Sequence, residues 1–131
     1  MAIISKNLFV VSLVCVLTYC ASTIPRVQDV IDMAPPRQVT YILEGHELLL
    51  KWQASTDESK PDFQGYNIYI SAKSLVFGFL SDLPEPLQLD KNVHQFKIDK
   101  EEVASPCFIH IRSRNTKGHL SYPSLPELVI P

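Results

Sequence analysis

The sequence predicts an all-β protein whose short strands pack as a two-layer sandwich, and three observations carry this prediction. Residues 106–115 alternate, so that the apolar Ile109 and Ile111 lie on one side of an extended chain and polar residues lie on the other. Further short alternating stretches follow along the chain and are separated by turn residues. Proline is frequent, with 10 residues, and glycine is scarce, with 4. Because proline cannot donate a hydrogen bond inside a sheet, it marks the loops and strand ends of such a protein.

The first 20 residues have the organisation of an export signal. Lys6 provides the positive charge, and residues 8–17 form an apolar core of ten residues, shorter than the roughly 20 residues that span a bilayer. Small residues follow at 20–22, where a peptidase could cleave. A retained membrane anchor or a buried helix is the alternative, but nothing lengthens the apolar run. We therefore expect an extracytoplasmic protein.

Residues 17–20 also resemble a bacterial lipobox, in which Leu17 would stand three positions before a lipidated cysteine, here Cys20. Tyr19 departs from that pattern, because a small residue normally precedes the cysteine. Two outcomes stay open: plain secretion, or lipidation of Cys20, which would anchor the protein at a bacterial membrane or cell surface. In either case residues 21–34 are expected to form a tether.

One folded domain is expected from 35 to 131, opened by the extended backbone of Pro35-Pro36. Alternation and turn residues predict strands over 37–43, 46–52, 63–70, 94–98, 106–115 and 119–130. The residues expected in the core are Leu50, Trp52, Tyr66, Ile68, Phe96, Ile98, Ile109 and Ile111.

Six short patterns occur in a fixed order: Pro35-Pro36, Leu50-x-Trp52, Gly65-Tyr66-x-Ile68-Tyr69, Phe96-x-Ile98, Ile109-x-Ile111-x-Ser113-x-Asn115 and Gly118-x-x-Ser121-x-Pro123-Ser124. Together they resemble a fibronectin type III domain over residues 35–131. The resemblance implies a seven-stranded immunoglobulin-like sandwich, with sheets A-B-E and C-C′-F-G and Trp52 at the centre of the core. That family usually begins strand F with a tyrosine, and Cys107 stands here instead. We therefore expect packing of Val103 and Phe108 to hold this corner.

Residue types that carry catalysis are present, but not in catalytic or metal-binding patterns. The four histidines lack the i, i+4 and His-x-His spacings that bring two imidazoles onto one metal, so we expect four unrelated surface histidines. The acidic neighbours Asp57-Glu58 and Glu101-Glu102 point in opposite directions on an extended chain. A weak calcium site from Asp57, Glu58 and Asp62 is an alternative to a solvated loop, but Pro61 and the missing glycine depart from a calcium loop.

These absences predict a protein that is not an enzyme and uses no metal and no cofactor. No nucleophile elbow and no phosphate-binding loop occurs in the sequence. The formal net charge of −2 supplies no basic excess, which argues against nucleic acid as a partner.

The outer face of strands 63–70 and 106–115 is the predicted contact face. An aromatic ring beside two arginines is typical of interface anchors. A solvated sheet face with no partner is the alternative. The residues expected on this face are Asn67, Tyr69, His110, Arg112 and Arg114.

The connection 71–89 is unusually apolar and must be buried somewhere. We expect Val76, Phe77 and Phe79 to form strand C′ and to cover one edge of the core. An exposed patch for a partner or a second copy is the alternative.

The expected function is that of a non-catalytic, extracytoplasmic binding or adhesion module that contacts a protein or a glycan through this sheet face or through loops. An Arg-Gly-Asp tripeptide, which serves adhesion in some relatives, is absent from the sequence. Two alternatives stay open. One is a carbohydrate-binding accessory module of a hydrolytic assembly, and the other is a structural envelope protein that associates with itself.

Overall fold

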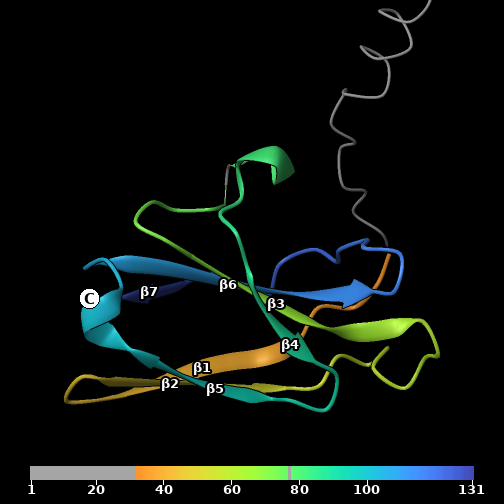
Figure 1. Cartoon of the computed structure of the whole chain (residues 1–131), viewed down its shortest axis with the longest axis horizontal. Coiled ribbons are helices and arrows are strands. Elements are labelled where there is room, and N and C mark those ends of the chain that lie inside the picture. Colours follow the sequence, from red (N-terminus) through yellow and green to blue (C-terminus); the bar gives the residue numbers. More distant parts are fainter. Residues whose placement is uncertain (1–31, 77) are drawn as a thin grey trace, which may run out of the picture.

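The computed structural model describes residues 32–76 and 78–131 (Figure 1). The predicted export segment, Cys20, Phe77 and most of the predicted tether lie outside the described residues. No helix in the described part of the chain is long and apolar enough to cross a membrane. The strands are β1 (Arg37–Glu44), β2 (Glu47–Gln53), β3 (Phe63–Ser71), β4 (Leu87–Asp90), β5 (Gln95–Asp99), β6 (Cys107–Asn115) and β7 (Leu128–Ile130), and two short 3₁₀ helices are η1 (Leu80–Asp82) and η2 (Lys100–Glu102).

The strands form two antiparallel sheets that pack face to face (Figure 1). The three-stranded sheet has the order β1-β2-β5, and the four-stranded sheet has the order β4-β3-β6-β7. The strands divide between the sheets as the resemblance implied, but strand C′ (β4) lies at the edge beside C (β3), so the order is C′-C-F-G rather than C-C′-F-G. The all-β sandwich expected from the alternation is therefore present.

The core lies between the two sheets and contains every residue that was predicted for it. Leu50, Tyr66, Ile68 and Ile111 are completely buried, whereas Phe96 is only partly buried at the edge of the core. Trp52 packs edge-to-face on Tyr66, with 5.8 Å between ring centroids.

The folded domain begins before residue 35. Met33 is buried in the main core, and the backbone of Ala34 bonds to three loop and strand side chains. The last two residues of the predicted tether therefore belong to the sandwich.

Strand C′ lies further along the chain than expected. It is β4, in which Leu87 and Leu89 point inward opposite Ile68 and Tyr66 of β3. Val76 and Phe79 lie outside the strands and are 47% and 76% exposed, so the prediction that they form this strand and cover the core is wrong. The reason is that Glu127 binds the backbone at Leu75 and draws the segment over the outer face of the sheet.

Only the last part of the predicted final strand pairs as a strand. Upstream of β7, two serines replace regular pairing with β6. Ser121 donates its amide to the carbonyl of Ser113, and its Oγ accepts the amide of Ser113, both at 2.9 Å. Ser124 makes the same pair of bonds with Ile111, at 2.8 and 3.2 Å. The backbone groups of β6 are thus satisfied although Pro123, which has no N–H, interrupts the ladder.

The corner before β6 is held differently from the prediction. Cys107 is completely buried and Val103 packs on the core as expected. Phe108, however, lies on the opposite face of β6 because neighbouring side chains alternate. Lys100 supplies a polar tie instead, since its Nζ donates to Oγ of Ser105 at 3.0 Å.

Candidate functional site

The structure brings the residues of the predicted contact face together, but it buries them. Asn67 pairs with Arg112 and Tyr69 pairs with His110 in the register of β3 and β6, so these side chains share the outer face of the four-stranded sheet. Tyr69 is 2% exposed, His110 is 0% exposed and both arginines are 7% exposed. The expectation that this face is open to a partner is therefore wrong.

Two segments of the chain cover this face, and we call them the cover: residues 72–76 and 78–83, and residues 119–127. Figure 1 shows both on the side of the four-stranded sheet that faces away from the three-stranded sheet. Leu75 and Leu120 are buried against Tyr69 and form a second, smaller core with it. The alternation of β3 and β6 predicted which side of the sheet these residues occupy, but not that other segments lie on top of them.

Glu127 fastens the cover to the sheet. Its carboxylate accepts the amide of Leu75 at 2.8 Å and the hydroxyl of Ser74 at 2.7 Å, and it lies 2.8 Å from Nε2 of His110. Burial lowers the pKa of His110, and the charge of Arg112 adds to this, against the opposing pull of Glu127. His110 is therefore a buried histidine rather than a surface one. The sequence did not single out Glu127.

The two arginines are used inside the domain. Nη1 of Arg114 donates to the carbonyls of Tyr66 and Leu89, each at 2.8 Å, and so ties β6 to β3 and β4. Nη1 of Arg112 donates to the carbonyl of Ser121 in the cover at 2.9 Å. Burial lowers the pKa of both guanidinium groups. These bonds stabilise the domain, and they occupy the two arginines that were predicted to contact a partner.

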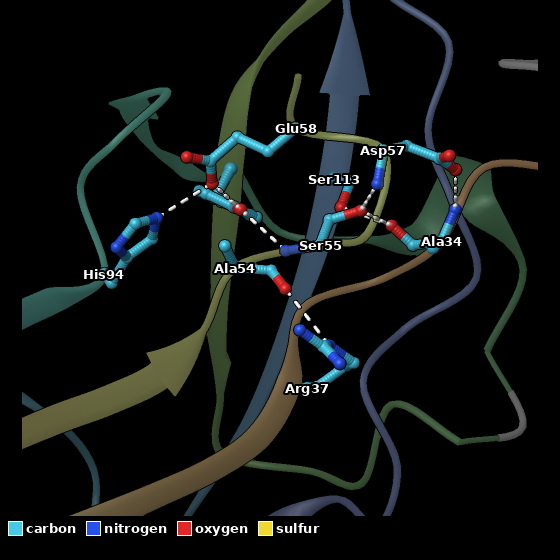
Figure 2. A network of polar contacts seen from close by, with 9 residues as sticks. Ala34, Arg37, Ala54, Ser55, Asp57, Glu58, His94 and Ser113 are labelled. Carbon is cyan, nitrogen blue, oxygen red and sulfur yellow. Dashed lines mark hydrogen bonds and ion pairs between the residues drawn. The ribbon is translucent and has the colours of Figure 1, made fainter. Parts of the chain in front are cut away.

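A polar network joins the loop between β2 and β3 to Tyr66 of β3 and to His94, which precedes β5 (Figure 2). The hydroxyl of Tyr66 donates to Glu58 and accepts the amide of Ser55 at 3.0 Å, and Nε2 of His94 lies 2.8 Å from the same Glu58 oxygen. Burial raises the pKa of Tyr66. Burial also acts to raise the pKa of Glu58, but the hydrogen bonds from Tyr66 and His94 outweigh it and hold that pKa below its usual value.

The neighbouring carboxylate, that of Asp57, binds the backbone of the first residues of the domain. It accepts the amide of Ala34 at 2.7 Å and pairs with Lys60 at 2.9 Å, and the bond from Ala34 is the main reason that the pKa of Asp57 is lowered. Ser55 and Ser113 both donate to the carbonyl of Ala34, at 2.6 and 2.8 Å, and Figure 2 shows their hydroxyl groups beside it. Within residues 32–76 and 78–131, no acidic, histidine or cysteine side chains gather as metal ligands.

A groove opens between the edge strands β4 and β5, and the sequence did not predict it. It has a volume of about 390 Å³. In Figure 1 the two strands are joined by the turn after β4 and diverge from it, each belonging to a different sheet. The groove is lined by apolar side chains of both sheets and of the segment after η2: Ile68, Ile70, Leu87, Phe96, Ile98 and Val103.

The rim of the groove is acidic. Glu85, Asp99 and Glu102 line it together with a single basic residue, Lys97. Nζ of Lys97 lies 3.5 Å from Glu47, so its charge is already shared with a carboxylate. A second hollow, of about 310 Å³, shares Lys97, Ile98 and Asp99 with the groove. The groove therefore combines apolar walls with an excess of negative charge at its mouth.

No family model matches the sequence, and no curated protein is significantly similar to it. Several solved structures resemble the fold, among them these three. The spore cortex lytic enzyme SleM of Clostridium perfringens is 17% identical with a TM-score of 0.55, over 75% of this chain and 28% of that one. The chicken CNTN1 FN1-FN3 domains are 16% identical with a TM-score of 0.51, over 72% and 29%. The third fibronectin III domain of the human KIAA0343 protein is 18% identical with a TM-score of 0.52, over 82% and 90%.

These similarities show the fold, which is that of fibronectin type III domains, as the resemblance in the sequence implied. The chain spans less than a third of the first two structures and nine-tenths of the single human domain.

Proposed function

We propose that the chain is a non-catalytic, extracytoplasmic binding module that holds an apolar group of its ligand in the groove between β4 and β5. The observation that carries this proposal is the exposure of inner-face residues in the groove. Leu87 belongs to the core-facing side of β4 and is 41% exposed, and Ile70 and Phe96 are only partly buried. The volume of about 390 Å³ falls within the roughly 300–1,000 Å³ that is usual for ligand pockets.

The groove is a better contact site than the predicted face. The side chains of Tyr69 and Arg112 are bonded within the domain and lie beneath the cover, so a partner would first have to displace buried leucines. The groove, in contrast, is open without any rearrangement. An apolar group that binds in the groove removes its walls from water, which contributes about 25 cal/mol to binding for each Å² of apolar surface buried.

A direct test is to titrate the full chain with n-heptanol and to follow the backbone amide chemical shifts by NMR. We expect saturable shifts at the groove residues. Leu87→Trp should fill the groove and abolish the shifts, whereas Leu125→Trp, a matched change at a leucine that is 71% exposed on the cover, should leave them unchanged. The absence of saturable shifts, or equal behaviour of the two variants, would refute the proposed site.

A second candidate function is that of a glycan-binding accessory module in a hydrolytic assembly. Two exposed aromatic residues of the cover favour it, since Phe79 is 76% exposed and Tyr122 is 65% exposed, and aromatic faces suit stacking against sugar rings. The similarity to part of a spore cortex lytic enzyme is consistent with it. Binding of a soluble cell-wall glycan that is lost in Tyr122→Ala and retained in Leu87→Trp would select this function over the groove.

Export is part of the proposed function and rests on the N-terminal sequence. Mass spectrometry of the mature protein tests it. An acylated Cys20 would make the protein a membrane-anchored surface module, and an unmodified start at Ala21 or Thr23 would make it a secreted one. Recovery of an intact Met1 would contradict export.

A further inference from the structure

The two sheets differ in width, and the difference leaves room for one more strand. The four-stranded sheet extends to β4, whereas the three-stranded sheet ends at β5 on the same side of the sandwich. The groove is the uncovered area that results. A fourth strand paired with β5 would lie opposite β4 and would cover the apolar walls, including Ile70 and Leu87.

The backbone of β5 offers unpaired groups to such a strand. His94 accepts the amide of Trp52 at 3.0 Å, and Lys100 donates its amide to His46 at 2.7 Å, so the even-numbered residues of this strand bond to β2. Backbone groups point to alternate sides along a strand. The amides and carbonyls of Gln95, Lys97 and Asp99 therefore face the open edge, where no strand of the described chain pairs with them.

The acidic residues around this edge favour a ligand with positive charge. Glu85, Asp99 and Glu102 line the groove, and Glu101 lies next to them in η2, where it pairs with His46 at 3.2 Å. Among the described residues that line the groove, Lys97 is the only cation, and Lys100 of η2 donates to Ser105 at 3.0 Å. Complementary charges speed association and exclude ligands of the wrong sign, so a basic segment fits this edge and an acidic one does not.

We infer that the free edge of β5 accepts an extended, basic peptide segment of a partner protein as a fourth strand, with alternate apolar side chains in the groove and lysine or arginine at its acidic rim. This is strand addition, in which backbone hydrogen bonds give affinity and side-chain pockets give specificity. The inference rests on the proposed function, because it assigns the apolar group in the groove to a peptide.

The probes are capped peptides of one design. The parent is Lys-Val-Thr-Val-Thr-Val-Lys, whose valines share one face of a strand, and a partner peptide carries glutamate at both ends. Isothermal titration of the full chain at low ionic strength should show that the lysine peptide binds roughly tenfold more tightly than the glutamate peptide. The combined change Glu85→Gln and Glu102→Gln should remove most of this difference.

Two further peptides test the backbone pairing. One is N-methylated at the three valines and the other at the two threonines, so each blocks the hydrogen bonds on one edge of the strand. Because a strand added to β5 pairs along one edge only, one methylated peptide should bind like the parent and the other should lose at least tenfold in affinity. Equal affinities of the two methylated peptides would overturn strand addition.

A change in the protein provides the matching control. Lys97→Pro removes the amide that faces the open edge and should weaken peptide binding at least tenfold, because proline is tolerated in an edge strand where its missing N–H faces outward. Lys97→Ala loses the same side chain, including its contact with Glu47, but should keep peptide affinity. Heptanol binding in both variants reports an intact groove.

The outcomes separate the two proposals. Heptanol binding without peptide binding would overturn the peptide inference and leave the groove as a ligand site. If the protein bound neither heptanol nor the peptide, the proposed function itself would be refuted. Self-association of the chain that Lys97→Pro abolishes, without peptide binding, would assign the edge to a second copy and overturn the inference.

Discussion

The Oε2 atom of Glu127 lies 2.8 Å from Nε2 of His110, and the two side chains are 9% and 0% exposed. His110 belongs to β6, whereas Glu127 ends the second segment of the cover and also binds Ser74 and Leu75 of the first. This one carboxylate therefore joins both segments of the cover to the four-stranded sheet.

Replacing Glu127 with alanine should destabilise the protein by about 2–3 kcal/mol, because the change leaves the amide of Leu75 without its acceptor beside a buried imidazole. Glu127→Gln keeps an acceptor oxygen, so its free energy of unfolding should decrease clearly less. Urea unfolding of the two variants measures the difference. A loss below about 0.5 kcal/mol in Glu127→Ala would show that the carboxylate does not hold the cover.

The stability of the protein should fall as the pH drops below about 6.5, the usual pKa of histidine. Burial lowers the pKa of His110, so the unfolded chain binds a proton in this range that the folded chain does not, and the free energy of unfolding decreases with falling pH. One such proton gives a slope of at most about 1.4 kcal/mol per pH unit. Unfolding curves between neutral pH and mild acid measure it. His110→Gln should flatten this dependence, and an unchanged slope would contradict the assignment.

Tyr66→Phe should destabilise the protein by about 1–3 kcal/mol, because the lost hydroxyl both accepts the amide of Ser55 and donates to the largely buried Glu58. The variant should also lose less stability than the parent protein when the pH is lowered. Glu58, whose pKa is lowered in the folded state, stabilises it above the usual value of 4.5, and this contribution is lost as the pH falls. Thermal unfolding at neutral and acidic pH should show a smaller acid loss in Tyr66→Phe than in the parent protein. An equal loss would exclude the hydroxyl as the cause.

Gly65→Ala should destabilise the sandwich by more than about 2 kcal/mol, since a Cβ at this position would lie 2.0 Å from the carbonyl oxygen of Leu89 in β4. That carbonyl also accepts Arg114, so a shift of β4 would break a second contact. Guanidinium unfolding tests the prediction against Gly45→Ala, where no heavy atom lies within 4 Å but φ is +59°. A Gly65→Ala variant that is as stable as the parent would contradict the close packing of β4.

Alternation in the sequence predicted the layers of the fold because it acts locally. Ile98 lies between Lys97 and Asp99, and Ile111 lies between two polar residues as well; both face the core as expected. A period of two residues needs no knowledge of distant segments. The same period placed Tyr69 and His110 on the outer face correctly.

The period could not reveal that these two residues are buried, because their burial depends on Leu75 and Leu120, which lie far away in the sequence. The groove was missed for a related reason. It depends on which residues form strand C′, and β4 begins only at Leu87, because the apolar segment before it lies over the outer face of the sheet.

A basic peptide that binds along the open edge of β5 would change the surroundings of a few identified backbone amides. These changes can be followed by NMR of the full chain with the lysine peptide. We predict that the amides of Gln95, Lys97 and Asp99 shift and become protected from exchange with solvent, while the amides on the free edge of β1 do not change. Protection at β1, or changes confined to the cover, would contradict the account.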